Sequence, residues 1–361
     1  MHIGFDVKQT TAFRVHFELI MANLTMTISD FEDEKFRNLL PPIVFIVITL
    51  IIGVPGNIVV LVIYGKKYVK SVHRTIVWNL AVADQIFCTI GIPFNIARIV
   101  HYYSFEGEWA CVVFVVLLYF LLLYSTHLLL LLSIHRFRKI CFPLRTQISL
   151  DNVNYWVIAC FSIALILSAP HFGLSKYEKI KVGYNLTGFS CAISLSNPSI
   201  YSTAFSYGFL ALFFVYTIVL VVIYSIIGRK LYIQHTGRIK KKITSSTQKA
   251  ISSKMTKIAF AISMVFAVSY IPLFILQITE KMIDKDDLNT FQFAMLRIGE
   301  RLYLVNHVAN PFIYGIFDNQ FKKHFKKLIT CNWRHDETKS NNRDSTTVTE
   351  VQLEQFINTN V

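Results

Sequence analysis

Polar side chains in the middle of long apolar stretches are the residues of this chain whose chemistry needs an explanation. Asp84 is the most costly of them, because a carboxylate surrounded by hydrocarbon costs at least about 2.5–3.5 kcal/mol and so marks a functional site. Other polar residues at a similar depth in their own stretches are Asn57, Asn79, Ser125, Asn306 and Asn310. Together with Asp84 they could surround water molecules or hold a small cation such as Na+. Hydrogen bonds between helices, without any ion, are the alternative.

Two histidines, His127 and His307, also lie at mid-depth in apolar stretches. Histidine titrates near neutral pH, so these side chains could sense protons. Since no acidic partner is apparent for either residue, we expect both to be neutral core groups held by hydrogen bonds.

The segments between the apolar stretches give no sign of catalysis. They contain no nucleophile–base pair, no glycine-rich phosphate loop and no spacing typical of metal ligands. We therefore do not expect an enzyme, and no cofactor is predicted apart from a structural Na+ at Asp84.

Seven apolar stretches must position these polar residues. Hydrophobic residues make up 53% of the chain and charged residues 16%, whereas roughly a quarter of the residues of a soluble protein are charged. Each stretch is long enough to cross a bilayer as a tilted helix. They cover residues 41–65, 75–97, 111–135, 153–172, 201–228, 256–278 and 292–316. The sequence therefore predicts an all-α membrane protein, with a seven-transmembrane helix bundle over residues 41–316 after an N-terminal tail over residues 1–40.

Positive charge is divided unevenly between the two sides of the membrane. With the N-terminus outside, about twice as many Lys and Arg fall on the inner side as on the outer side. Such an excess of Lys and Arg on the cytoplasmic side is typical of membrane proteins. The net charge of +14 therefore belongs to the inner surface, where it attracts anionic lipid, and it does not indicate nucleic-acid binding. Two N-glycosylation sequons, at Asn23 and Asn185, both fall on the outer side.

Short motifs occur in a specific order at the ends of these stretches. They are Gly56-Asn57, Asn79-Leu80-Ala81-Val82-Ala83-Asp84, Trp109 with Cys111, His135-Arg136-Phe137, Trp156, Phe266 through Pro272, and Asn310-Pro311-Phe312-Ile313-Tyr314. Any one of these motifs can occur by chance, but the ordered set is specific. Over residues 40–331 the chain resembles the rhodopsin family (class A) of G-protein-coupled receptors.

The resemblance implies how the two ends of the bundle are built. Cys111 and Cys191 stand at the positions of this family's usual disulfide. A short amphipathic eighth helix on the membrane surface is expected over residues 317–331, with a palmitoylation site at Cys331 and a disordered cytoplasmic tail over residues 332–361. The resemblance also places the chain in the plasma membrane, with its N-terminus outside the cell.

The resemblance implies partners inside the cell as well. A heterotrimeric G protein is expected at the inner ends of the helices. The hydroxyl-rich tail suits phosphorylation by a receptor kinase and binding of arrestin. The residues expected to act in coupling and activation are His135, Arg136, Phe137, Leu144, Tyr224, Phe266, Tyr270, Pro272, Asn310, Pro311 and Tyr314.

Several positions depart from the family pattern. His135 stands where the family has an acidic residue that pairs with the neighbouring arginine, and Ser252 or its neighbours precede the sixth helix in place of an acid. Arg136 therefore lacks an obvious ionic partner. Loss of such a contact shifts a resting equilibrium, so we expect raised ligand-free activity, with poor G-protein coupling as the alternative. Tyr270 replaces the switch tryptophan, and Tyr216 replaces a proline of the fifth helix.

Family positions narrow the ligand by exclusion. Leu304 occupies the place of the lysine that binds retinal, and Leu118 the place of the aspartate that binds biogenic amines. A neuropeptide-like ligand is favoured, and a lipid or a small chemosensory molecule is the alternative. The residues expected in the ligand pocket are Arg98, Leu118, Tyr119, Glu300, Arg301 and Tyr303. From another class, a transporter or channel also places acids within the membrane, but the paired interrupted helices of transporters are not visible.

Overall fold

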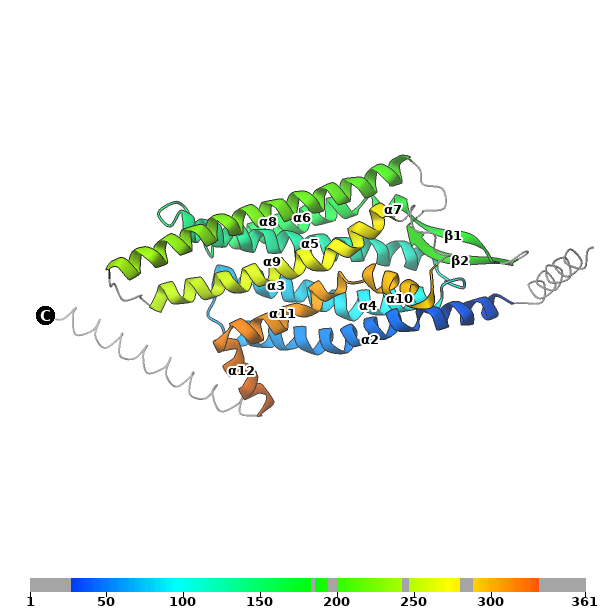
Figure 1. Ribbon diagram of the computed structural model, residues 1–361, viewed down its shortest axis with the longest axis horizontal. Coiled ribbons are helices and arrows are strands. Elements are labelled where there is room, and N and C mark those ends of the chain that lie inside the picture. Colours follow the sequence, from blue (N-terminus) through cyan, green and yellow to red (C-terminus); the bar gives the residue numbers. More distant parts are fainter. Residues whose placement is uncertain (1–26, 183–185, 194–199, 242–246, 280–287, 331–361) are drawn as a thin grey trace, which may run out of the picture.

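The structure is a computed structural model, and it describes residues 27–182, 186–193, 200–241, 247–279 and 288–330. Its long helices lie side by side along one axis, with a β-hairpin at one end and a short helix turned away from the bundle at the other (Figure 1). The elements are α2 (Ile28–Lys66), α3 (Val72–Ile86), η1 (Phe87–Gly91), α4 (Ile92–Val100), α5 (Glu108–Cys141), α6 (Val153–Ser168), α7 (His171–Leu174), β1 (Ser175–Val182), β2 (Leu186–Ile193), α8 (Ile200–Lys241), α9 (Thr247–Thr279), α10 (Thr290–Gly299), α11 (Leu304–Phe317) and α12 (Asn319–Ile329).

Within the described residues, six helical segments are long and apolar enough to cross a membrane. They are Ile28–Lys66, Val72–Val100, Glu108–Cys141, Val153–Leu174, Thr203–Ile233 and Lys254–Leu276. The seventh predicted span is made by α10 and α11 in series, and both helices pack against α2 and α9. The predicted seven-helix bundle is thus confirmed.

The seventh span differs from the prediction because it is interrupted. The break follows Gly299, a residue with low helix propensity, and the turn contains the charged pair Glu300-Arg301. Hydrogen bonds in the turn reach back only three residues, from Arg301 N to Ile298 O and from Leu304 N to Arg301 O. Hydropathy alone does not reveal this break, because both flanking segments remain apolar.

The first span begins earlier than predicted. Thr27 accepts a hydrogen bond from the backbone of Asp30, and the Asp30 carboxylate accepts one from the backbone of Thr27, which together form a capping box. This cap starts α2 at Ile28, so that the helix extends beyond the predicted start at residue 41.

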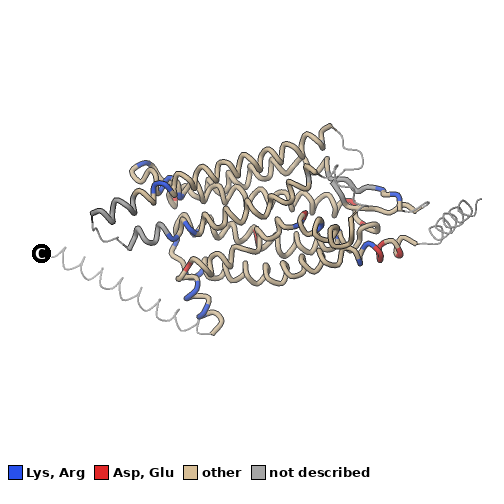
Figure 2. Tube along the Cα trace, in the orientation of Figure 1, with Lys and Arg blue, Asp and Glu red and all other residues tan. Residues whose placement is uncertain are grey.

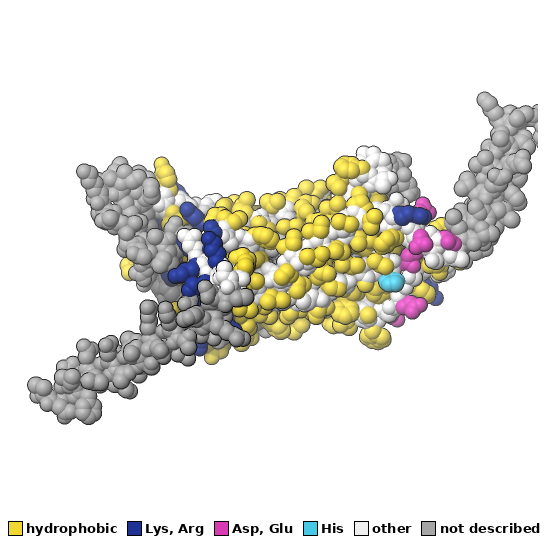
Figure 3. Space-filling model, turned by 90° about the horizontal axis from the view of Figure 1, so that it is seen from below, with side chains coloured by type: hydrophobic (Ala, Val, Ile, Leu, Met, Phe, Trp, Pro, Cys, Tyr) yellow, Lys and Arg dark blue, Asp and Glu magenta, His cyan; other side chains and the backbone are white. Residues whose placement is uncertain are grey.

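The outer surface of the bundle is an apolar band between two polar ends (Figure 3). Isoleucines on its flank, such as Ile51, Ile166 and Ile218, are largely exposed. Contiguous apolar surface of this extent is unfavourable in water and suits hydrocarbon. Lys and Arg gather at the end that bears α12, whereas most Asp and Glu lie at the hairpin end (Figure 2). The chain is therefore a multi-pass membrane protein.

A π-helical turn interrupts the second span where its polar face meets α11. Pro93 has no backbone N–H to donate to the preceding turn, and the N–H of Ile92 bonds to the carbonyl of Phe87, five residues earlier. The widened turn exposes one face of the Phe87 ring to α11, where it stacks on His307 with a centroid distance of 3.9 Å.

The hairpin is tied to the bundle covalently and by backbone hydrogen bonds. The disulfide between Cys111, at the start of α5, and Cys191, on β2, confirms the expected pairing. Phe189 N donates to Tyr103 O at 2.7 Å, so the loop before α5 lies directly against β2. A side chain at Gly188 would clash with that carbonyl at 2.6 Å, so this contact requires glycine.

We expect Cys191→Ser to lower the thermal unfolding midpoint of the purified full-length protein. The disulfide joins residues 80 positions apart, and removing such a constraint costs about 2–4 kcal/mol. Cys160→Ser is the matched control, because it removes a free buried thiol without opening a loop. Equal midpoints for wild type and Cys191→Ser would show that the hairpin is held by its noncovalent contacts alone.

Candidate functional site

Asp84 is the centre of a polar cluster between α3, α5 and α11. Its carboxylate is completely buried. Oδ1 accepts hydrogen bonds from His307 Nδ1 at 2.7 Å and from Ser125 Oγ at 3.4 Å, and Oδ2 accepts one from Asn310 Nδ2 at 2.6 Å. The structure therefore brings Ser125 and Asn310 to Asp84. The expectation that His307 lacks an acidic partner is wrong, because the partner lies 223 residues away in the sequence.

Other polar residues at the same depth do not contact Asp84. Asn57 donates to His307 O at 2.9 Å and to Gly53 O, and thereby joins α2 to α11. Asn79 donates to Thr75 O within its own helix and accepts a hydrogen bond from the Tyr124 hydroxyl on α5 at 3.4 Å. Asn306 is buried, and its side-chain oxygen has no hydrogen-bond partner within the described part of the chain.

His127 is a core group held by hydrogen bonds, as expected from its position. Its Nδ1 lies 2.6 Å from Leu123 O, and its Nε2 lies 2.8 Å from the hydroxyl of Tyr216. Tyr216 is the residue that stands in the place of the fifth-helix proline. Its hydroxyl therefore makes a polar contact between α5 and α8 that proline cannot make.

Arg136, at the inner end of α5, is 3% exposed and has no hydrogen bond or ion pair among the described residues. The neighbouring His135 is also buried, and its Nδ1 has no partner in the same region. A hydroxyl cluster nearby joins three helices instead. Tyr224 on α8 lies 2.9 Å from Ser133 Oγ on α5 and accepts a bond from Ser263 Oγ on α9 at 3.3 Å.

Asp318, between α11 and α12, is the centre of a second ionic cluster. Its carboxylate is completely buried and lies 3.0 Å from Lys254 Nζ on α9. Tyr68 donates its hydroxyl to Asp318 Oδ2 at 2.5 Å, and Gln320 N donates to Oδ1, which caps α12. Burial and the bond to Asp318 raise the pKa of Tyr68. Sequence reasoning missed this cluster and placed Asp318 inside the helix predicted over residues 317–331, although aspartate is a common residue at the N-cap that precedes a helix.

Three further residues expected in activation, Phe266, Tyr270 and Tyr314, form aromatic contacts with neighbouring helices. Phe266 and Tyr270 on α9 both lie next to Phe213, at centroid distances of 5.9 and 6.2 Å. Tyr314 packs between Tyr64 and Phe321, on α2 and α12 respectively. These contacts leave both tyrosines, Tyr270 and Tyr314, almost completely buried.

Other expected activation residues lie in close helix contacts or on the surface. Pro311 lies so close to α2 that a side chain at Gly56 would meet its ring at 3.0 Å. Pro272 lies inside α9. Phe137 packs edge-on against Phe142, and Leu144 in the following loop is fully exposed.

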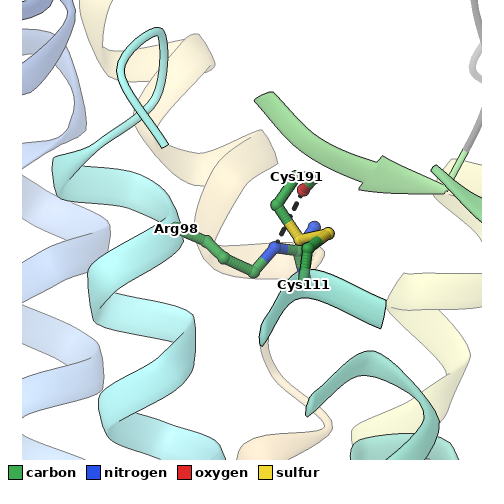
Figure 4. The surroundings of a disulfide bond; sticks show 3 residues. All are labelled: Arg98, Cys111 and Cys191. Carbon is green, nitrogen blue, oxygen red and sulfur yellow. Dashed lines mark hydrogen bonds between the residues drawn. A yellow bond between two sulfur atoms is a disulfide. The ribbon is translucent and has the colours of Figure 1, made fainter. Parts of the chain in front are cut away.

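Three arginines and one glutamate form a cluster at the hairpin end. Arg98 Nε donates to the backbone oxygen of Cys191 at 3.0 Å, beside the disulfide (Figure 4). Glu300 accepts from Arg297 through both of its carboxylate oxygens and from Arg301 through one of them. Arg98 and Arg301 are close enough for their charges to interact. This cluster of four side chains therefore carries an excess of positive charge, although most Asp and Glu of the described residues lie at the same end of the bundle.

Aromatic and aliphatic side chains accompany these arginines. Tyr303 lies next to Tyr270 and edge-on to Phe87. Tyr119 stacks on His171 at 3.5 Å. Leu118 lies against η1, where a side chain at Gly91 would clash with it.

Some predicted sites lie outside the described residues. They are the sequons at Asn23 and Asn185, the cysteine Cys331, and the tail over residues 332–361.

Comparison with known proteins gives a family match over most of the chain. A family model described as "7 transmembrane receptor (rhodopsin family)" matches residues 56–314. The allatostatin-A receptor of Bombyx mori is 26% identical over 84% of each chain. The neuropeptide Y receptor type 2 of Mus musculus is 25% identical over 80% of this chain and 75% of its own, and the type-1 angiotensin II receptor A of Xenopus laevis is 28% identical over 80% and 78%.

Proposed function

The chain belongs to the rhodopsin family of seven-transmembrane receptors, and from this premise we propose that it binds an extracellular peptide and activates a heterotrimeric G protein. The observation that carries the peptide assignment is the similarity, over about four fifths of the chain, to receptors whose names refer to allatostatin-A, neuropeptide Y and angiotensin II. The uneven charge of the two ends supports a plasma-membrane receptor with its N-terminus and hairpin outside the cell.

The arginine cluster of Arg98, Arg297 and Arg301 at the hairpin end favours a ligand with an acidic or carbonyl-rich terminus. Glu300 pairs with both Arg297 and Arg301, which leaves Arg98 without a carboxylate, and Arg301 with only a shared one, among the described residues. Guanidinium groups bind carboxylates and amide oxygens in a directional way. Tyr303 lies near both arginines and offers aromatic surface. A peptide C-terminus, as a carboxylate or an amide, matches this arrangement.

The opposite end suits a G protein. Arg136 makes no bond in the described part of the chain, and it is buried, so a partner can reach it only if the surrounding helices separate. Leu144 is exposed in the next loop and is available for an apolar contact. The expected partners of the tail, a receptor kinase and arrestin, rest on its hydroxyl-rich sequence.

The ion pair between Lys254 and Asp318 can stabilise the resting state of the receptor without any contact of Arg136. It joins α9 to the junction of α11 and α12 at the end where the helices must separate. The family's acidic partner for the arginine is missing, so this pair is the cross-helix ionic contact that the described residues provide at this end. Separation of α9 from α12 would break it.

The first test is second-messenger output from cells that express the receptor with a promiscuous G protein and are exposed to a peptide library. We expect a saturable response to at least one peptide, and no response from Arg136→Ala at equal surface expression. Silence of the wild type toward every peptide, with surface expression verified, would contradict the peptide assignment. A full response from Arg136→Ala would contradict the proposed role of Arg136.

With an active peptide in hand, Arg98→Ala is expected to raise its half-maximal concentration about 10- to 100-fold, because a hydrogen bond between charged groups contributes about 1.5–3 kcal/mol. Lys181→Ala, which removes an exposed charge on β1, is the control at the same end and should change the potency little. A peptide that lacks its terminal carboxylate or amide group should lose potency on the wild type but not on Arg98→Ala. Equal losses on both receptors would show that the terminus binds elsewhere.

Lys254→Ala is expected to raise ligand-free signalling about two- to fivefold, since a partly exposed ion pair contributes on the order of 0.5–1 kcal/mol to the state that contains it. Lys257→Ala, which removes an exposed lysine one turn further along α9, is the matched control. Unchanged or lower ligand-free output from Lys254→Ala, normalised to surface expression, would mean that the pair does not stabilise the resting state.

A further inference from the structure

A sodium ion at the buried aspartate is the one cofactor that the sequence predicts, and the donors around Asp84 show whether such an ion fits. Hard cations take oxygen ligands, from carboxylates, carbonyls, hydroxyls and water. The Asp84 carboxylate is surrounded mainly by nitrogen donors instead. Ser125 Oγ, at 3.4 Å, is the one oxygen that contacts it among the described residues.

Both carboxylate oxygens of Asp84 already accept short hydrogen bonds from N–H groups. His307 Nδ1 lies 2.7 Å from Oδ1, and Asn310 Nδ2 lies 2.6 Å from Oδ2. These groups point hydrogen atoms, which carry partial positive charge, at the place where a cation would bind. An ion at this carboxylate would have to displace at least one of them.

The imidazole of His307 is fixed in its position. It is completely buried and stacks on the Phe87 ring with an interplanar angle of 15°. Its backbone oxygen accepts a hydrogen bond from Asn57 Nδ2, which anchors this turn of α11 to α2. A rotation of the ring away from Asp84 would lose both the stack and the hydrogen bond.

Three asparagines at a similar depth have side-chain oxygens that are unpaired within the described residues. The side-chain oxygens of Asn57, Asn306 and Asn310 are buried without a partner in the described part of the chain. Buried acceptors of this kind are commonly satisfied by water. Asn310 donates a hydrogen bond through its nitrogen to the carboxylate, and neither Asn57 nor Asn306 forms a hydrogen bond with Asp84 among the described residues.

We propose that His307 takes the place of a cation at Asp84, so that an imidazole–carboxylate contact holds α3 to α11 and the receptor does not bind Na+ there. The contact is direct, whereas an ion would join the two helices through shared coordination. This inference does not depend on the ligand of the receptor. It can therefore fail while the peptide assignment stands, or stand while that assignment fails.

The test is the thermal unfolding midpoint of the purified full-length receptor in detergent, measured in NaCl and in KCl at equal concentration. We expect equal midpoints for the wild type in the two salts. His307→Ser removes the imidazole and supplies an oxygen ligand, so this variant should gain a saturable, Na+-specific rise of about 2–4 °C at concentrations several times the binding constant. Asp84→Asn added to His307→Ser should abolish that rise.

His127→Ser is the matched control, because it removes the other mid-membrane imidazole, which bonds to Tyr216 and not to Asp84. It should show no Na+-specific change. A Na+-specific rise in the wild type would overturn the proposal, and this comparison requires no variant to fold. The absence of a rise in a folded His307→Ser would also overturn it, since the imidazole would then not be what excludes the ion.

Discussion

A carboxylate buried in the middle of an apolar bundle must be supplied with hydrogen-bond donors, and the arrangement of three helices follows from this requirement. Ser125 on α5 and His307 and Asn310 on α11 all direct donors at Asp84 on α3. Removing one partner of a buried charged group costs on the order of 3–5 kcal/mol, so each helix is fixed in both depth and rotation. Asn57 extends this constraint to α2 through its bond to the backbone of His307.

The two ends of the bundle are held by contacts of different strength. At the hairpin end, a disulfide and backbone bonds fix β2 to α5 and to the preceding loop, which keeps Arg98 in position beside Cys191. At the other end, hydroxyl contacts and the ion pair of Asp318 with Lys254 hold α9. Such contacts can be exchanged for others at modest cost, so a ligand at the fixed end can shift the population of states at the other.

The sequence alone predicts the depth at which a residue lies in the membrane better than it predicts which residues are its neighbours. Span length and the fixed rise per residue place Asp84, Ser125 and Asn310 at one level, and the disulfide follows from the family resemblance. The rotation of each helix about its own axis decides which side chains come into contact, and a single sequence does not reveal this rotation. Asn306 and His307 both lie within one turn of Asn310, yet only His307 reaches the carboxylate. The break after Gly299 was missed because it depends on local backbone hydrogen bonds and not on hydropathy. The cluster around Asp318 was missed because its partners Tyr68 and Lys254 are distant in the sequence.

Two departures from the family pattern are accompanied by contacts between helices that involve other chemistry. Tyr216, in the place of a proline, keeps its backbone N–H in α8 and adds a hydroxyl that lies 2.8 Å from His127 on α5. His135 brings no charge partner to Arg136, and the ionic contact at that end is supplied by Lys254 and Asp318. The two departures are thus accompanied by a polar contact between α5 and α8 and by an ionic contact between α9 and the junction of α11 and α12. Each of these contacts fixes the position of one helix relative to another at its own depth in the bundle.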